Sequence, residues 1–215
     1  MSEKPPPESR FPAHIYEECG AYGEDYFQAV ARAQASVDRQ ALSRAATVLA
    51  GAISAGRTLF SCGNGGSAAI ANHLVCDCLK GIRTDTTVKP VVHSLVATME
   101  VITAIANDMA YDQVFAYQVQ SYVRPGDVLI AISSSGNSPN IVNALTAARA
   151  QGAHTIAMTG FTGGAAAALA DVSLHVDAHN YGVVEDVHQS IMHLLAQFLR
   201  QRHMTDPVLA ASRPF

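Results

Sequence analysis

The sequence predicts an α/β protein with a doubly wound, five-stranded parallel sheet flanked by helices and preceded by two long helices. Three observations lead to this class. Short apolar runs without polar alternation, such as residues 128–132, are typical of strands buried on both faces. Ala-rich segments with apolar residues every three or four positions are typical of helices, and they alternate with these runs. Two serine- and glycine-rich loops each join an apolar run to a helical segment, as in sheets that bind ligands at their strand ends.

Two helices are expected before the sheet, at residues 24–37 and 40–55. Both carry apolar residues at helical spacing, and neither contains Gly or Pro before Gly51. Their apolar residues occupy more than one face, which is more than a helix needs to cover a sheet. This surplus predicts contacts between subunits, with packing inside one chain as the alternative.

The rest of the chain alternates strands and helices. Strands are expected at Thr58–Ser61, Val91–Val96, Asp127–Ser133, His154–Met158 and Val172–Val176. Helices are expected at Ser67–Leu79, Glu100–Ala106, Asp112–Tyr122, Ser138–Gln151 and Val183–Arg200. Ser138 and Pro139 support one of these starts, because they supply an N-cap and a proline at the first helical position. The predicted strand order is the flavodoxin-like 2-1-3-4-5, in which the first and third strands are neighbours.

The composition of the 215-residue chain, 49% hydrophobic and 15% charged, is typical of one globular domain. Residues 1–13, rich in proline and charge, are expected to be a disordered tail, residues 14–203 the domain, and residues 204–215 a C-terminal tail. A net charge of −4 without a Lys/Arg run argues against nucleic-acid binding. The sequence has no apolar stretch of about 18 residues and no leader pattern. We therefore expect a cytoplasmic protein without membrane contact.

The two serine- and glycine-rich loops, residues 62–67 and 133–138, predict an anion site. Glycines let the backbone approach a ligand closely, while serine hydroxyls and the free amides of a helix N-terminus bind an anion. Neither loop has the Gly-x-Gly-x-x-Gly spacing of a dinucleotide site or the Gly-Lys-Ser/Thr ending of a P-loop. The pair therefore suits a single phosphate monoester, such as a sugar phosphate, held by hydroxyl groups. The expected phosphate ligands are Ser67, Ser133, Ser134, Ser135 and Ser138.

Two of the predicted helices also carry polar stripes. His73 and Asp77 are four residues apart on the helix after the first loop, and Glu185, Gln189 and His193 repeat at the same spacing on the closing helix. Polar groups on otherwise apolar helices need partners, because burial of an unpaired charge is costly. We expect the two stripes to face one another across the ligand.

The two loops, the Asn107-Asp108 pair and the 185–193 segment together resemble the sugar isomerase (SIS) domain and, within it, the phosphoheptose isomerases. The likeness covers nearly the whole chain. It implies the SIS fold, a homotetramer, and ketose–aldose isomerisation of a phosphorylated sugar, with sedoheptulose 7-phosphate as the leading substrate. The alternative is a non-catalytic SIS protein, either a sugar-phosphate sensor or a replication-initiator-associating protein. Asp77 and the stretch 67–69 resemble that branch as well, whereas His73, Glu185 and His193 favour the isomerase.

The resemblance also implies residue roles. Asp77 and His193 correspond to the family's Glu and His that move protons between neighbouring carbons. His73, Asp77, Glu185 and His193 correspond to a zinc-binding set of His, Glu, Gln and His, so Asp77 is one methylene shorter than its counterpart and Glu185 replaces a neutral amide. A divalent metal, expected to be zinc with manganese or nickel not excluded, would polarise the substrate oxygens. Further substrate contacts are expected from Asn64, Gly65, Thr98, Asn107, Asp108 and Glu185, with Thr98 in place of an Asp that contacts sugar hydroxyls in the isomerases.

Overall fold

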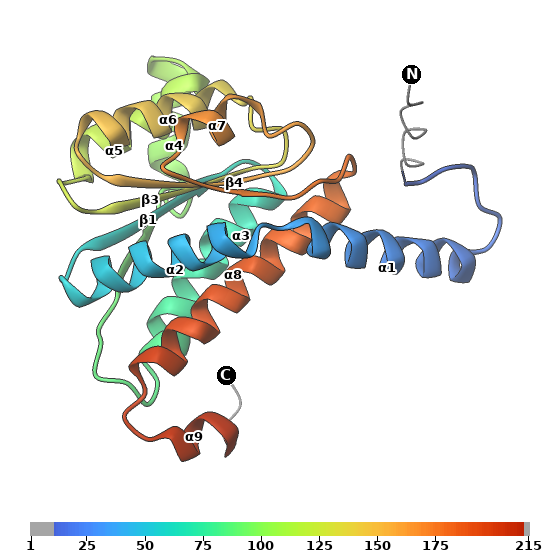
Figure 1. The fold of residues 1–215 in the computed structure, drawn as a ribbon. Helices are drawn as coiled ribbons and strands as arrows, with labels where there is room; N and C mark the ends of the chain where they lie inside the picture. The colour runs from blue at the N-terminus through green and yellow to red at the C-terminus, as the bar shows by residue number, and fades with distance from the viewer. Residues whose placement is uncertain (1–10, 213–215) are drawn as a thin grey trace, which may run out of the picture.

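The computed structural model describes residues 11–212 and contains one all-parallel sheet. Its strands are β1 (Thr58–Gly63), β2 (Val91–Ser94), β3 (Val128–Ser133), β4 (His154–Thr159) and β5 (Val172–His175). The strand order is β2-β1-β3-β4-β5, and every neighbouring pair is parallel. The predicted class and order are confirmed (Figure 1).

Helices cover both faces of this sheet. The α-helices are α1 (Cys19–Ser36), α2 (Arg39–Ser54), α3 (Gly66–Cys76), α4 (Met99–Asp108), α5 (Ala116–Tyr122), α6 (Pro139–Ala150), α7 (Gly164–Leu169), α8 (Tyr181–His203) and α9 (Pro207–Ser212). Figure 1 shows α2, α3 and α8 below the sheet and α5, α6 and α7 above it, while α1 extends sideways and packs on α8. The two predicted N-terminal helices are therefore present, and α2 packs within the chain, against the sheet.

Several elements differ from those expected. The predicted helix at 67–79 ends its α-helical part at Cys76 and continues as a π-helix, η1 (Asp77–Ile82). The predicted helix at 112–122 splits into a 3-10 turn, η2 (Tyr111–Gln113), and α5. Neither α7 nor α9 was predicted, because six residues are too few for a helical period to show. Residues 1–10 of the predicted N-terminal tail lie outside the described residues. Helix α9 lies within the predicted C-terminal tail, residues 204–215. The domain limits stay a prediction.

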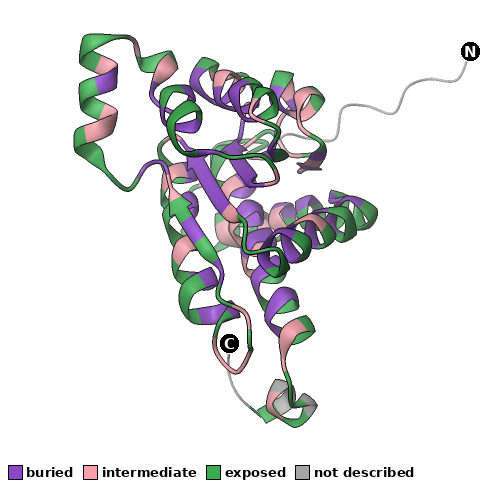
Figure 2. Cartoon of the chain, turned by 90° about the vertical axis from the view of Figure 1, so that its left-hand side faces the viewer, coloured by how far each residue is buried: buried purple, intermediate pink, exposed green. Residues whose placement is uncertain are grey.

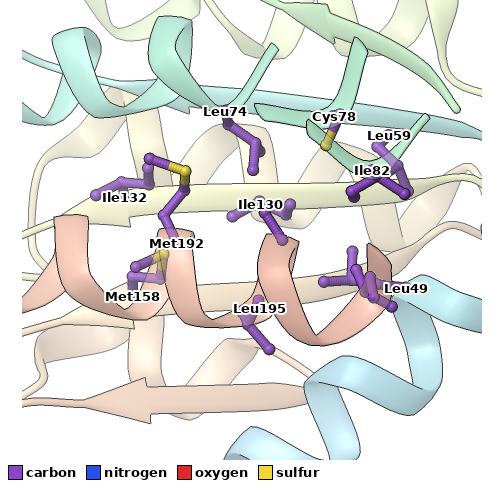
Figure 3. A pocket seen from close by; sticks show the side chains of 12 residues that line it. Leu49, Leu59, Leu74, Cys78, Ile82, Ile130, Ile132, Met158, Met192 and Leu195 are labelled. Carbon is purple, nitrogen blue, oxygen red and sulfur yellow. The ribbon is translucent and has the colours of Figure 1, made fainter. Parts of the chain in front are cut away.

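The core lies between the sheet and the helices on either side. All six residues of β3 are buried, as expected for a central parallel strand (Figure 2). Under the sheet, a small enclosed space remains between β1, β3, β4 and the helices α2, α3 and α8, and Leu59, Ile130 and Met192 are among the side chains around it (Figure 3). Every residue around this space is apolar or carries sulfur. It is therefore a packing space of the core and not a site for a polar ligand.

No helix among residues 11–212 is both long enough and apolar enough to span a bilayer.

The loop after β3 is fixed by contact with the loop after β4. Gly136 has a φ of +67°, and its carbonyl accepts a hydrogen bond from the amide of Ala166. A Cβ at position 136 would lie 1.9 Å from the carbonyl oxygen of Gly163. Asn137 adds a second link, since its side chain accepts from the amide of Ala165. Only glycine fits position 136, and its neighbours there are backbone atoms that cannot move aside cheaply.

We predict that Gly136→Ala lowers the free energy of unfolding more than Gly56→Ala does. Both glycines have positive φ, +67° and +66°, so both substitutions carry the left-handed cost of about 1–2 kcal/mol. Among the described residues no atom lies within 4 Å of a Cβ at position 56, whereas the Cβ at position 136 would collide with backbone. Urea unfolding of the two variants measures the difference, and equal losses would contradict the proposed contact between the loops.

Candidate active site

A pocket lies between the two serine- and glycine-rich loops. Since β1 pairs directly with β3, both loops leave the same edge of the sheet at the point where the winding reverses. The residues around the pocket are Asn64, Ser67, Ile132, Ser133, Ser134, Ser135, Ser138, Tyr181 and Glu185. All five serines expected to hold phosphate therefore share one pocket. Tyr181 was missed by the sequence analysis, because nothing in its local pattern separates it from other residues at a helix start.

Helix N-termini and uncommitted hydroxyls give this pocket the character of an anion site. Gly65 and Ser138 are the N-cap residues of α3 and α6. Gly65 has no side chain, and the hydroxyl of Ser138 makes no capping bond. In the first turns, the amides of Gly66 and Ser67 in α3 and of Asn140 in α6 have no backbone partner among the described residues and are suited to binding an anion, whereas Pro139 has no N–H. The hydroxyl of Ser134 is buried and has no hydrogen-bond partner among the described residues. A buried polar atom without a partner calls for a ligand or a water.

A second group of polar side chains joins α3 to α8. The buried carboxylate of Asp77 lies between two imidazoles, with His73 Nε2 3.3 Å from Oδ1 and His193 Nδ1 2.7 Å from Oδ2. The two imidazole rings meet edge to face with centroids 5.0 Å apart. The imidazoles are partly exposed, whereas the Asp77 side chain is only 8% exposed. The expected meeting of the two polar stripes is thus realised at these three residues.

The hydrogen bonds of His193 define the state of its ring. Its Nδ1 lies on the Asp77 carboxylate, and its Nε2 lies 2.8 Å from the amide nitrogen of Gln189. A carboxylate can only accept and an amide nitrogen can only donate, so the ring fits the neutral tautomer with the proton on Nδ1. The basic lone pair of His193 is therefore on Nε2, where Gln189 covers it.

The local backbone helps to place Asp77. It is the first residue of η1, where the helix changes from the α to the π pattern. The π pattern is rare, and where it occurs it is frequently found at functional sites. The segment η1 packs against α8, which carries His193. One continuous α-helix was predicted here, because the apolar spacing does not reveal that the hydrogen bonds span five residues instead of four.

Glu185 lies with the serine pocket and apart from the His73, Asp77 and His193 cluster. A Cβ on Gly66 would be 2.1 Å from the Glu185 carboxylate, which shows how closely that carboxylate lies against the first residue of α3. Burial, with a smaller effect from neighbouring Asp186, raises the pKa of Glu185. Eight residues along α8 amount to about 12 Å between Glu185 and His193. Only His73, Asp77 and His193 have ligand atoms within 4.8 Å of one another in the part of the chain described, so the role of Glu185 as a metal ligand stays a prediction that this conformation does not support.

The remaining predicted residues lie outside the serine pocket. Thr98 is the exposed N-cap residue of α4, and Asn107 and Asp108 are exposed at the end of that helix. The amide of Asn107 donates to the neighbouring Asp108 carboxylate at 2.7 Å. None of the three is among the residues that surround the pocket. Their substrate contacts stay predictions.

Comparison with known proteins identifies the family to which the chain belongs. The SIS domain family model matches residues 25–160. A phosphoheptose isomerase of Nitratidesulfovibrio vulgaris (strain Miyazaki F) is 43% identical over 155 residues, which cover 72% of this chain and 74% of the relative. A probable phosphoheptose isomerase of Thermoplasma acidophilum is 36% identical over 178 residues, covering 82% and 97%.

Solved structures give the same result. The phosphoheptose isomerase of Neisseria gonorrhoeae superposes with a TM-score of 0.76 at 31% identity, covering 84% of this chain and 95% of that one. The enzyme of Francisella tularensis gives a TM-score of 0.77 at 28% identity, covering 85% and 96%. The resemblance found in the two loops and the closing helix is therefore confirmed along most of the chain. The protein belongs to the SIS domain family, as a relative of the phosphoheptose isomerases.

Proposed function

We propose that this protein is a ketose–aldose isomerase that converts sedoheptulose 7-phosphate to a heptose 7-phosphate. The observation that carries the proposal is that two polar groups share the helices α3 and α8. One is the hydroxyl-lined pocket, which includes Ser67 and Glu185. The other is the buried carboxylate of Asp77 with the imidazoles of His73 and His193. Relatives named phosphoheptose isomerase and probable phosphoheptose isomerase, matched over 74% and 97% of their length, support the proposal. A phosphorylated sugar is an intracellular metabolite, which agrees with the cytoplasmic location expected from the sequence.

The distance between the two parts of the site favours a long acyclic substrate. Glu185, in the serine pocket, and His193 are separated by about 12 Å along α8. A sugar phosphate whose phosphate lies far from its carbonyl carbon suits this separation. A seven-carbon ketose with the phosphate on C7 and the carbonyl on C2 has that layout, and a triose phosphate does not.

Asp77 and His193 are the groups that we assign to proton transfer. The reaction removes a proton from C1, forms an enediol, and returns a proton to C2 while the hydroxyl proton moves between the two oxygens. Carboxylates and imidazoles perform such transfers in enzymes. By accepting from Nδ1, Asp77 keeps the basic lone pair of His193 on Nε2, and Gln189 must move away before that atom can take a proton. Ligand entry is a suitable cause for this movement.

The same cluster has donors that suit a divalent metal. Two imidazole nitrogens and one carboxylate oxygen lie within 4.8 Å of one another. Three protein ligands with one position left open are typical of catalytic zinc. We assign His73, Asp77 and His193 to this role, with zinc as the proposed ion. A lone pair that binds an ion cannot also take a proton, so metal binding and proton transfer by Asp77 and His193 are alternative uses of the cluster. Such an ion would polarise the carbonyl and enediol oxygens of the substrate.

We also propose a homotetramer in which α1 takes part in the subunit contacts. Ala29 and Ala33 are the two buried residues of α1, while Phe27 is 72% exposed. Leu194 and Phe198 on the neighbouring α8 are also exposed, 49% and 45%. A helix that leaves large apolar side chains on its outer face is typical of an oligomer interface. The second N-terminal helix, α2, is committed to the core and contributes less of this surface.

We predict that Asp77→Asn and His193→Gln each lower kcat by about 10²–10⁴, because each removes one acid–base group. Sugar-phosphate binding should persist, since both changes leave the serine pocket intact. NMR of sedoheptulose 7-phosphate in deuterated water follows aldose formation and deuterium uptake. His154→Gln is the control and should keep full activity, because His154 is the first residue of β4 and lies at the end of the sheet away from the serine loops. Full turnover by His193→Gln would refute the assignment, and a wild-type protein that binds without turnover would favour the non-catalytic alternative.

We predict that the double substitution Ser135→Ala and Ser138→Ala weakens sedoheptulose 7-phosphate binding by at least tenfold. Each hydrogen bond to a charged group contributes about 1.5–3 kcal/mol. Isothermal titration calorimetry measures the affinity. Ser121→Ala is the matched control, because its hydroxyl is exposed on α5 and, within residues 11–212, bonds only to the Tyr117 carbonyl of its own helix. Wild-type affinity in the double variant would mean that the phosphate binds elsewhere.

We predict that Phe27→Asp dissociates the assembly, because it puts a charge into the proposed apolar interface. Light scattering at micromolar concentration should give a tetramer for the wild type and a smaller species for the variant. Val208→Asp, on an equally exposed residue of α9, should leave the mass unchanged. A monomeric wild-type protein would rule out the tetramer.

A further inference from the structure

Asn140 links the two loops of the pocket through a pair of amide hydrogen bonds. It lies in the first turn of α6 and is only 1% exposed. Its Nδ2 donates to Asn64 Oδ1 at 2.9 Å, and Asn64 Nδ2 donates back to Asn140 Oδ1 at 3.0 Å. Asn64 belongs to the loop after β1, whereas Asn140 follows the loop after β3. This reciprocal pair is therefore a direct side-chain connection between the two loops.

The turn η2 adds a third contact to the same amide. The hydroxyl of Tyr111 donates to Asn64 Oδ1 at 3.0 Å. Nearby, Asn143 on α6 donates from its side chain to the carbonyl of Asp112 at 3.1 Å. The turn is thus held both to α6 and to the first loop, with Tyr111 directed to the Asn64 amide.

Among the described residues, these bonds leave the side chain of Asn64 with one free polar function. An amide oxygen has two lone pairs, and on Asn64 both are used, one by Asn140 and one by Tyr111. An amide nitrogen has two hydrogens, and on Asn64 one of them is donated to Asn140. The group that remains is a single N–H donor, on a residue that borders the serine pocket. A donor is what a phosphate or a sugar oxygen requires.

We propose that Asn140 and Tyr111 are positioning residues that fix the Asn64 amide with its nitrogen toward the ligand. Without them the amide could turn by half a rotation and present its oxygen, which would repel an anionic ligand. The proposal rests on the proposed function only in taking a phosphorylated sugar as the ligand. It assigns neither residue a contact with the substrate, because both act through Asn64.

A double-mutant cycle on the full-length protein tests this proposal. Asn140→Ala should weaken sedoheptulose 7-phosphate binding by about tenfold, the loss expected for one hydrogen bond to a charged group. In the Asn64→Ala background the same substitution should change the affinity by less than about twofold, because the residue through which it acts is gone. Equal losses in the two backgrounds would overturn the proposal, as would wild-type affinity in Asn140→Ala.

Tyr111→Phe covers the case in which the buried Asn140→Ala variant fails to fold. Tyr111 is 58% exposed, so removal of its hydroxyl leaves the packing unchanged. Tyr111→Phe should weaken binding in the wild-type background and have no effect in the Asn64→Ala background. Unchanged affinity in the wild-type background, or equal losses in the two backgrounds, would overturn the proposal. Thr146→Ala is the control on α6, because its hydroxyl is exposed and its one hydrogen bond in the described part of the chain lies within the helix. It should bind like the wild type.

A parallel titration with inorganic phosphate separates this proposal from the substrate assignment. If the wild type binds phosphate but not sedoheptulose 7-phosphate, the substrate assignment fails, and the cycle measured with phosphate still decides the role of Asn140. If the wild type binds neither, both proposals are overturned.

Discussion

The pairing of β1 with β3 is the constraint on which the rest of the structure depends. These strands are neighbours although β2 lies between them in the sequence, so the loops that follow them leave the same edge of the sheet. The helices α3 and α6 start directly after these loops and bring their N-termini to one pocket. The amide pair of Asn64 and Asn140 then joins the two loops. A site built from two such loops needs little charge of its own, because backbone amides and hydroxyl groups provide the attraction for an anion.

The other half of the site depends on the burial of one carboxylate. A buried, unpaired charge is costly, and Asp77 avoids this cost by contact with two imidazoles. His73 reaches it from one turn earlier on the same helix, and His193 reaches it from α8. The imidazoles remain partly exposed, so a ligand can approach the cluster. Glu185 has a different environment on the same helix α8, since it borders the serine pocket and lies against Gly66.

Much of the site could be predicted from residues within one element. A spacing of four places His73 and Asp77 on one helix face, and the strand, loop and helix order placed the five serines at the switch point. Asn140 was missed because its function depends on a partner 76 residues away, and a polar residue in the first turn of a helix looks like an ordinary surface position. The hydrogen bond between Asp77 and His193 joins residues that are 116 positions apart. Both residues were predicted from the resemblance to the phosphoheptose isomerases and not from local periodicity.

The sequence by itself determined the class of the fold, the order of the strands and the position of both loops. Each of these follows from local periodicity and from the short-range rules of turns, caps and parallel sheets. Only the tertiary structure decided which polar side chains meet, for example that Glu185 joins the serines and not the cluster of His73, Asp77 and His193. The physical reason is that periodicity shows which face of a helix is buried but not how far the helix is shifted along its neighbour. That shift is set by the packing of α8 against α1, α3 and η1, which involves residues distant in the chain.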